Sequence, residues 1–146
     1  MEYVERLTVP LRWWAQGTMM VASFWLAVAV VDALSGLAVL AITLIVALVV
    51  GGGLLSYGAA RIEVNDRELR AGRAHIAREH VGTATPLDAE QSHRAAGVDA
   101  DARAFLVLRP YLKRAVRVEI TDPQDPTPYW LISTRHPKRL ARALNS

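Results

Sequence analysis

The sequence predicts an α+β membrane protein. A transmembrane helical hairpin would be followed by a small antiparallel β-barrel or bent sheet with a C-terminal capping helix. Two long uncharged runs fill most of residues 13–60. Short segments of alternating apolar and polar residues follow, separated by turn-forming residues. Pro137 then opens a last amphipathic stretch, as is typical of the first turn of a helix.

The two uncharged runs are long enough to cross a bilayer. As a helix, residues 37–60 exceed the roughly 30 Å of hydrocarbon at about 1.5 Å per residue. Residues 13–31 form the other run, and only the short segment 32–36 separates them. Because such a segment has room for a tight turn alone, the two helices are expected to be antiparallel neighbours.

The start of the first run resembles a membrane interface. Arg12 stands beside Trp13 and Trp14, so a cation would face headgroups while the indoles occupy the boundary layer. A cleaved signal peptide is the rival interpretation of this run. Asp32 and a second long apolar run argue against cleavage.

Basic residues flank the pair of runs and are absent from the turn between them. They are Arg6 and Arg12 before the first run, and Arg61, Arg67, Arg70 and Arg73 after the second. The positive-inside rule then places both termini in the cytoplasm, the turn outside, and the protein in the plasma membrane with two spans. Residues 1–12 would be a cytoplasmic N-terminal segment, and residues 61–146 a cytoplasmic domain.

Small residues lie at matching depths in the two predicted helices. If the turn is centred near Leu34, Gly17 lies opposite Gly51. Gly52 and Ser56 are four residues apart and share a helix face. We therefore assign these four residues to helix packing or to contact between copies of the chain. Neither run contains Asp, Glu, Lys, Arg or His, which disfavours a pump or an ion pathway.

The polar part of the chain reads as a meander of short strands. The expected strands are 61–64, 68–71, 74–77, 81–85, 104–108, 115–121 and 129–133. The strongly apolar segment 104–108 is expected at the centre of the sheet. Residues 88–103 are expected to be a loop or a frayed helical turn, since Gly97 and scattered charges disfavour a long helix. A final helix is expected over 137–144, with Leu140 and Leu144 on one side.

Two motifs support a resemblance that spans the chain. The opening YVERLTVPLRWW (residues 3–14) and the segment STRHP (residues 133–137) resemble an actinobacterial family of small two-helix membrane proteins. The ending YWLISTRHPKRLARAL, after short strands and hairpin turns, resembles bacterial pleckstrin-homology-like (PH-like) domains. The resemblance implies a membrane location and a PH-like fold for the cytoplasmic domain. It implies no activity and no catalytic residues.

Cations gather in two parts of the polar region. They are Arg109, Lys113, Arg114 and Arg117, and then Arg135, Lys138, Arg139 and Arg142. Such residues are candidates for binding a protein partner or anionic lipid headgroups. The competing interpretation is a solvated face that follows the positive-inside bias.

The sequence disfavours several other classes of function. The chain has no cysteine, and its histidines lack metal-ligand spacing, so no metal or cofactor is expected. No P-loop, dinucleotide fingerprint or G-x-S-x-G turn is present, and we expect no enzyme. Residues 61–146 hold 15 basic and 11 acidic residues, and the resulting charge of +4 is too small to indicate nucleic acid by itself.

These observations favour a non-catalytic adaptor or scaffold. Its expected partners are membrane lipids, a protein and further copies of the chain. The alternative is an accessory subunit of a larger cell-envelope enzyme or transport complex, working through the helical hairpin.

Overall fold

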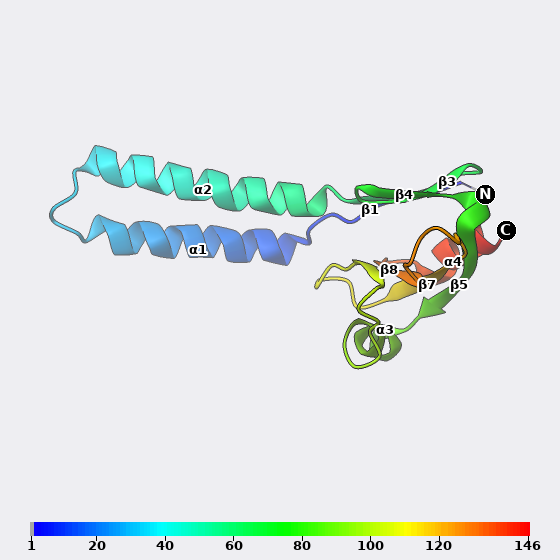
Figure 1. Cartoon of the computed structure of the whole chain (residues 1–146). Coiled ribbons are helices and arrows are strands. Elements are labelled where there is room, and N and C mark those ends of the chain that lie inside the picture. The colour runs from blue at the N-terminus through cyan, green and yellow to red at the C-terminus, as the bar shows by residue number, and fades with distance from the viewer. Residues whose placement is uncertain (1) are drawn as a thin grey trace. The chain divides into compact units, whose positions relative to one another are not determined.

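The computed structural model describes residues 2–146, which form two compact units. The helical unit is Thr8–Ala59. The sheet unit joins the residues up to Leu7 to the segment Ala60–Ser146. Figure 1 labels the helices and strands of both units. The sequence predicts a separate segment over residues 1–12, whereas the structure groups the first residues with the sheets.

The helical unit consists of α1 (Leu11–Ala29) and α2 (Gly36–Gly58), which lie side by side and antiparallel (Figure 1). The Ser35 side chain caps α2 by accepting a hydrogen bond from the Ala38 N–H at 3.2 Å. Near the other end of the pair, the rings of Trp13 and Tyr57 are stacked, with centroids 6.3 Å apart.

Within the described residues, α2 alone is long and apolar enough to cross a membrane. The prediction of two spans is therefore supported for one helix only. The reason is an offset between α1 and the apolar run 13–31. The helix takes in Arg12 at its start and ends before Val30 and Val31, which lowers its mean hydropathy.

The first sheet is a four-stranded antiparallel meander in the order β1-β2-β3-β4. Its strands are β1 (Tyr3–Arg6), β2 (Arg61–Val64), β3 (Glu68–Ala71) and β4 (Ala74–Ala77). Strand β1 was not expected from the sequence. Its four residues alternate, with Val4 and Arg6 exposed and Glu5 buried, but a buried glutamate conceals the pattern.

The second sheet has the order β5-β7-β8-β6. Its strands are β5 (Val81–Leu87), β6 (Phe105–Val107), β7 (Ala115–Ile120) and β8 (Tyr129–Ser133). Strand β6 runs parallel to β8, so the expected all-antiparallel barrel or bent sheet is wrong in this part. The apolar segment 104–108 lies at the sheet edge, not at its centre, and the centroid of the Phe105 ring lies 4.9 Å from that of Trp130.

Two strands paired in one sheet are separated in the chain by the whole helical unit. The β1–β2 ladder pairs Arg6 with Arg61. One step further on, the Leu7 N–H donates to the Ala60 carbonyl at 2.9 Å. The helical unit is thus an insertion into a β-hairpin, at the position a tight turn would otherwise occupy.

The core of the sheet unit receives side chains from both sheets and from α4 (Pro137–Asn145). Fully buried members include Leu7, Ile62, Leu69, Val116, Ile132 and Leu140. Helix α4 packs on β5 and β7, and Leu140 and Leu144, predicted to lie on one side of it, are both buried. The Arg78 guanidinium caps the end of α4 by donating to the Leu144 carbonyl at 2.9 Å.

Helix α3 (Ala89–Ala96) occupies part of the stretch expected to be a loop or a frayed turn. A capping box at its N-terminus explains why these residues form a helix. The Asp88 side chain accepts from the Gln91 N–H at 2.8 Å, and the Gln91 side chain accepts from the Asp88 N–H at 3.0 Å. The expectation of no long helix in residues 88–103 is correct, because α3 ends at Ala96.

Candidate functional site

The turn from β8 into α4 is held by a buried carboxylate from the other end of the chain. Glu5 is 8% exposed and accepts hydrogen bonds from three groups. The Tyr3 hydroxyl donates to its Oε2 at 2.7 Å, and the Thr134 hydroxyl donates to the same oxygen. The Arg135 N–H donates to its Oε1 at 2.9 Å. This network ties the YVER and STRHP motifs together.

Charge and burial explain why the network is complete. A buried carboxylate is costly unless donors or cations compensate it. Besides its three donors, Glu5 has the Arg135 guanidinium 4.0 Å from Oε1. Burial of Tyr3 raises its pKa to about 12; the hydrogen bond to Thr134 opposes that rise, and the neighbouring Glu5 adds to it.

Backbone pairing brings the two cation-rich segments together. Ala115 of β7 lies opposite Ser133 of β8, and the Thr134 N–H continues this ladder by donating to the Arg114 carbonyl at 3.1 Å. Residues 113–114 therefore lie beside residues 134–136, which are distant from them in the chain.

A hollow of about 580 Å³ opens at this junction. Its cationic wall comes from Arg114, Arg135, Lys138 and Arg139. A second hollow of about 500 Å³ shares Arg114, Arg135 and His136 with the first and adds Lys113. We call these two hollows the cationic groove and define it by Lys113, Arg114, Arg135, Lys138 and Arg139.

The larger hollow is lined by four cations and one carboxylate, Asp88, so the groove is electrostatically suited to anions. Among the described residues, Lys113, Arg114, Lys138 and Arg139 make no ion pair with a carboxylate. Helix α4 begins here with Pro137 in its first turn and with no side-chain cap at its N-terminus. The partial positive charge of that helix end adds to the charge of the side chains. Leu87 and Pro137 supply apolar lining.

Three of the predicted binding residues are placed elsewhere. Arg109 donates its N–H to the Ser133 hydroxyl at 3.1 Å, and its guanidinium donates to the Leu108 carbonyl. The Arg117 guanidinium lies over the Tyr129 ring, 4.1 Å from its centroid. Arg142 is exposed on α4, beyond the residues that line the groove.

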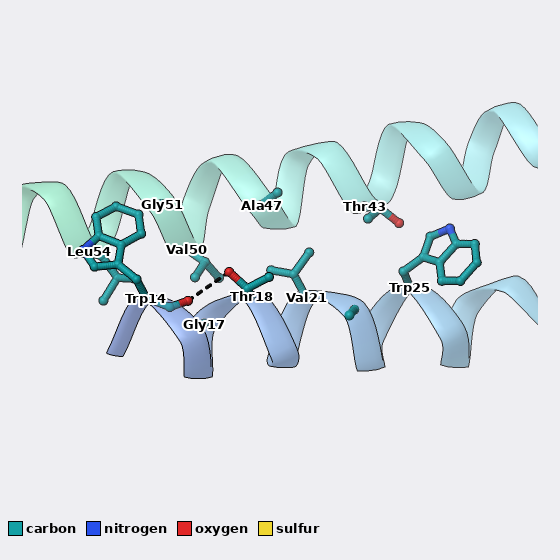
Figure 2. A pocket seen from close by; sticks show the side chains of 11 residues that line it. Trp14, Gly17, Thr18, Val21, Trp25, Thr43, Ala47, Val50, Gly51 and Leu54 are labelled. Carbon is teal, nitrogen blue, oxygen red and sulfur yellow. Dashed lines mark hydrogen bonds between the residues drawn. The ribbon is translucent and has the colours of Figure 1, made fainter. Parts of the chain in front are cut away.

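The predicted packing residues divide into two groups. A Cβ on Gly17 would meet the Val50 and Leu54 side chains at 3.2 and 3.3 Å, so this glycine lies in the α1–α2 contact. Gly17 and Gly51 both line an apolar hollow of about 440 Å³ between the helices (Figure 2). Gly52 and Ser56 are exposed in the chain, and a Cβ on Gly52 would enter open space.

The sequence did not identify Tyr3, Glu5 or Thr134 as part of the site. From the sequence, Glu5 looks like an ordinary surface charge, because its burial depends on the pairing of β1 with β2. The sequence signal that does exist is the alternation of Val4, Glu5, Arg6 and Leu7, which fits a strand if an acid is allowed in the core. Within residues 2–146, no three histidine, aspartate or glutamate side chains gather closely enough to hold a metal ion.

Comparison with known proteins identifies a family. Comparisons with curated proteins and with solved structures find no match. A family model described as "Protein of unknown function (DUF3093)" matches residues 2–144. The match extends from β1 to α4 and so includes both halves of the Glu5 network. The chain therefore belongs to the DUF3093 family.

Proposed function

We propose that the protein is a two-span plasma-membrane adaptor whose cytoplasmic sheet unit binds an acidic segment of a protein partner in the cationic groove. The observation that carries this proposal is the convergence of two cation-rich segments on one hollow. The described residues gather no three side chains that could hold a metal ion, and the proposed role is non-catalytic.

Chain connectivity supports the second membrane span. Strands β1 and β2 are paired, so residues 7 and 60 lie on the same side of any membrane. If α2 crosses the bilayer, Gly36 and Gly58 lie on opposite sides. The chain between residues 8 and 35 must then cross as well, and α1 is the segment available to do so. Helices meet the bilayer requirement that every backbone polar group be satisfied.

The arrangement of the sheet unit supports the PH-like assignment in outline. A four-stranded meander is followed by a second sheet and then by a helix that packs on it. The parallel pairing of β6 with β8 departs from an all-antiparallel barrel.

The size and lining of the groove favour an acidic peptide segment over a single phosphate group. Its larger hollow measures about 580 Å³, within the range of about 300–1,000 Å³ usual for ligand sites. Its cations come from two segments, and Leu87 and Pro137 also line it. An acidic segment carrying an apolar side chain could use both kinds of contact, and this would suit a reversible adaptor.

Site-specific photo-crosslinking in cells tests this assignment. A photo-reactive amino acid replaces Lys138 in the groove or, as the matched control, Arg103. Arg103 is an exposed arginine outside the groove. We expect a discrete protein adduct from position 138 and none from position 103. Arg114→Glu and Arg139→Glu together should remove the adduct, whereas Arg94→Glu and Arg67→Glu should not.

Two outcomes contradict the proposal. Equal adducts from both positions would show that the groove has no special role. An adduct to lipid alone from position 138 would reassign the groove from a protein partner to headgroups.

The helix pair favours a second candidate function, that of an accessory subunit in a larger envelope complex. Gly52 and Gly53 are exposed with open space at their Cβ positions, so another helix could approach α2 closely there. Gly52→Leu should then release the complex in mild detergent, while variants of the groove should leave it intact.

A further inference from the structure

Three arginines outside the cationic groove gather at one end of the first sheet. Arg6 lies directly opposite Arg61 in the β1–β2 ladder. The Gly72 N–H donates to the Arg61 carbonyl at 2.8 Å, so Gly72 lies beside Arg61 and Arg73 follows one residue further along the chain. We call Arg6, Arg61 and Arg73 the arginine triad.

The local backbone explains the position of Arg73. Ala71 pairs with Ala74, so Gly72 and Arg73 form a two-residue hairpin loop. Gly72 has φ of 63°, and a glycine with positive φ at the first loop position is the pattern of a type II′ hairpin turn. This tight turn fixes Arg73 at the tip of the β3–β4 hairpin, one residue from the hydrogen bond to Arg61.

Alternation places Arg6 and Arg61 on the same outer face of the sheet. Their neighbours Leu7 and Ile62 are fully buried on the other face, and all three arginines of the triad are exposed. Cα atoms of directly opposite residues in an antiparallel pair are about 4.5–5.5 Å apart. The Arg6 and Arg61 side chains can therefore reach a common ligand.

The triad lacks internal charge compensation. Among residues 2–146, no carboxylate forms an ion pair with any of its three guanidinium groups. Glu63 occupies the next outward position on β2, opposite Val4, and makes no such pair. Like charges directly opposite each other in a sheet are destabilising, so an external anion between them would be favoured.

Chain length sets which anion is within reach. Helix α2 has 23 residues and spans about 34 Å at 1.5 Å per residue, slightly more than the roughly 30 Å hydrocarbon core. Residues 59 and 60 add at most about 7 Å before Arg61. The headgroup layer is itself roughly 5–7 Å thick on each side. Arg61 therefore stays within reach of lipid phosphates, and its ladder partner stays with it.

We propose that the arginine triad binds the phosphate of an anionic phospholipid in the leaflet where α2 ends. This inference rests on the membrane-crossing part of the proposed function but not on the groove. Each guanidinium can donate in parallel to two phosphate oxygens, which gives Arg an advantage over Lys at such a site. The bound headgroup would stabilise the end of the first sheet against the membrane surface.

Native mass spectrometry of the full chain in detergent tests the site. The ligands are phosphatidylglycerol and, for comparison, zwitterionic phosphatidylcholine. We expect preferential binding of phosphatidylglycerol by the wild type. Replacing Arg6, Arg61 and Arg73 with Gln should weaken that binding on the order of 100-fold, from roughly fivefold per arginine near an anionic surface. Circular dichroism establishes that the Gln variant is folded. A variant with Lys at the same three positions keeps the charge and serves as a second folding control.

Two control variants separate this proposal from the other functions. The set Arg67→Gln, Arg94→Gln and Arg103→Gln removes the same charge elsewhere and should leave lipid affinity within a few-fold of wild type. The groove substitutions Arg114→Gln and Lys138→Gln, at residues that do not line the hollow beside Arg6, should also leave it unchanged, even if they abolish the crosslink to a partner.

Several results would overturn the inference. Equal affinity of the triad variant and the wild type would exclude the site. Loss of lipid affinity in the groove variant alone would move headgroup binding to the groove. Displacement of phosphatidylglycerol by an equal concentration of inorganic phosphate would identify a site for soluble phosphate instead.

Discussion

Glu5 shows how one residue couples the two ends of the chain. Its carboxylate receives the Tyr3 and Thr134 hydroxyls and the Arg135 N–H, and it is almost fully buried. Removing one partner of such a network leaves a buried charge partly uncompensated. The start of α4, where the cationic groove lies, is therefore positioned by a residue of β1.

Tyr3 provides a pH test of this network. Its pKa is raised from 10.0 to about 12, so the folded state favours the protonated phenol. Its contribution to stability is fully present below pH 10 and is lost as pH rises towards about 12. Tyr3→Phe should lack this component. Urea unfolding at about pH 8 and about pH 11 gives the comparison, followed by Trp130 fluorescence after Trp13, Trp14 and Trp25 have been replaced with Phe in both proteins. If the free energy of unfolding depended on pH in the same way in the wild type and in Tyr3→Phe, the proposed contribution of Tyr3 would be refuted.

Ser92 is a second residue with a clear expectation. Its hydroxyl is buried in α3 without a hydrogen-bond partner. Ser92→Ala removes the unsatisfied group and improves helix propensity, so stability should rise by about 1 kcal/mol in urea unfolding. The matched control is Ser133→Ala, which deletes the acceptor for the Arg109 N–H and should destabilise. A loss of stability in Ser92→Ala would show that the Ser92 hydroxyl makes a stabilising interaction.

At the level of elements, the α1–α2 contact depends on Gly17. Gly17→Leu would drive its side chain into Val50 and Leu54, since even a Cβ at this position would lie 3.2 and 3.3 Å from their side chains. Overpacking of this kind costs about 1–3 kcal/mol. The thermal midpoint of the helical signal in detergent should fall.

Gly53→Leu is the control for that substitution. Nothing lies within 4 Å of the position its Cβ would take, and its helix propensity improves. Its midpoint should be equal to or above that of the wild type. If Gly53→Leu lowered the thermal midpoint more than Gly17→Leu, the helix contact would involve the face of α2 that carries Gly53, which contradicts the structure.

Elements with strong local signals could be predicted from the sequence. Helix α2 follows from apolar length, and α4 follows from Pro137 with Leu140 and Leu144 one turn apart. Strand β1 and the edge position of β6 depend on pairing with strands distant in the chain, so the local pattern of apolar residues does not predict them. The same is true of the groove: charge identified its cations, but the β7–β8 register decides that Arg114 joins Arg135 while Arg117 does not.

At the level of the whole molecule, the sheet unit is discontinuous in sequence. Residues 2–7 supply β1, and the helical unit interrupts the hairpin between β1 and β2. Insertions are tolerated where the two ends of the interrupted segment lie close together. The Leu7–Ala60 hydrogen bond shows that they do.

This arrangement predicts that the helical unit can be removed without loss of the sheet unit. Replacing residues 8–59 with Asn-Gly supplies a two-residue hairpin turn in their place. The shortened chain should give a dispersed amide NMR spectrum. Residues 60–146 alone should not, because they lack β1 and Glu5. Equal dispersion in both would show that β1 is not part of the folded unit.

In the proposed topology, the helical unit crosses the membrane twice and returns the chain to the side where it began. The chain has no cysteine, so single cysteines at Ala33 and Ser146 can be labelled without background. The decisive measurement is labelling of intact cells with a membrane-impermeant maleimide. We expect labelling of Ala33→Cys in intact cells, and of Ser146→Cys only after the membrane is permeabilised. Labelling of Ser146→Cys in intact cells, or protection of Ala33→Cys, would contradict the two-span topology.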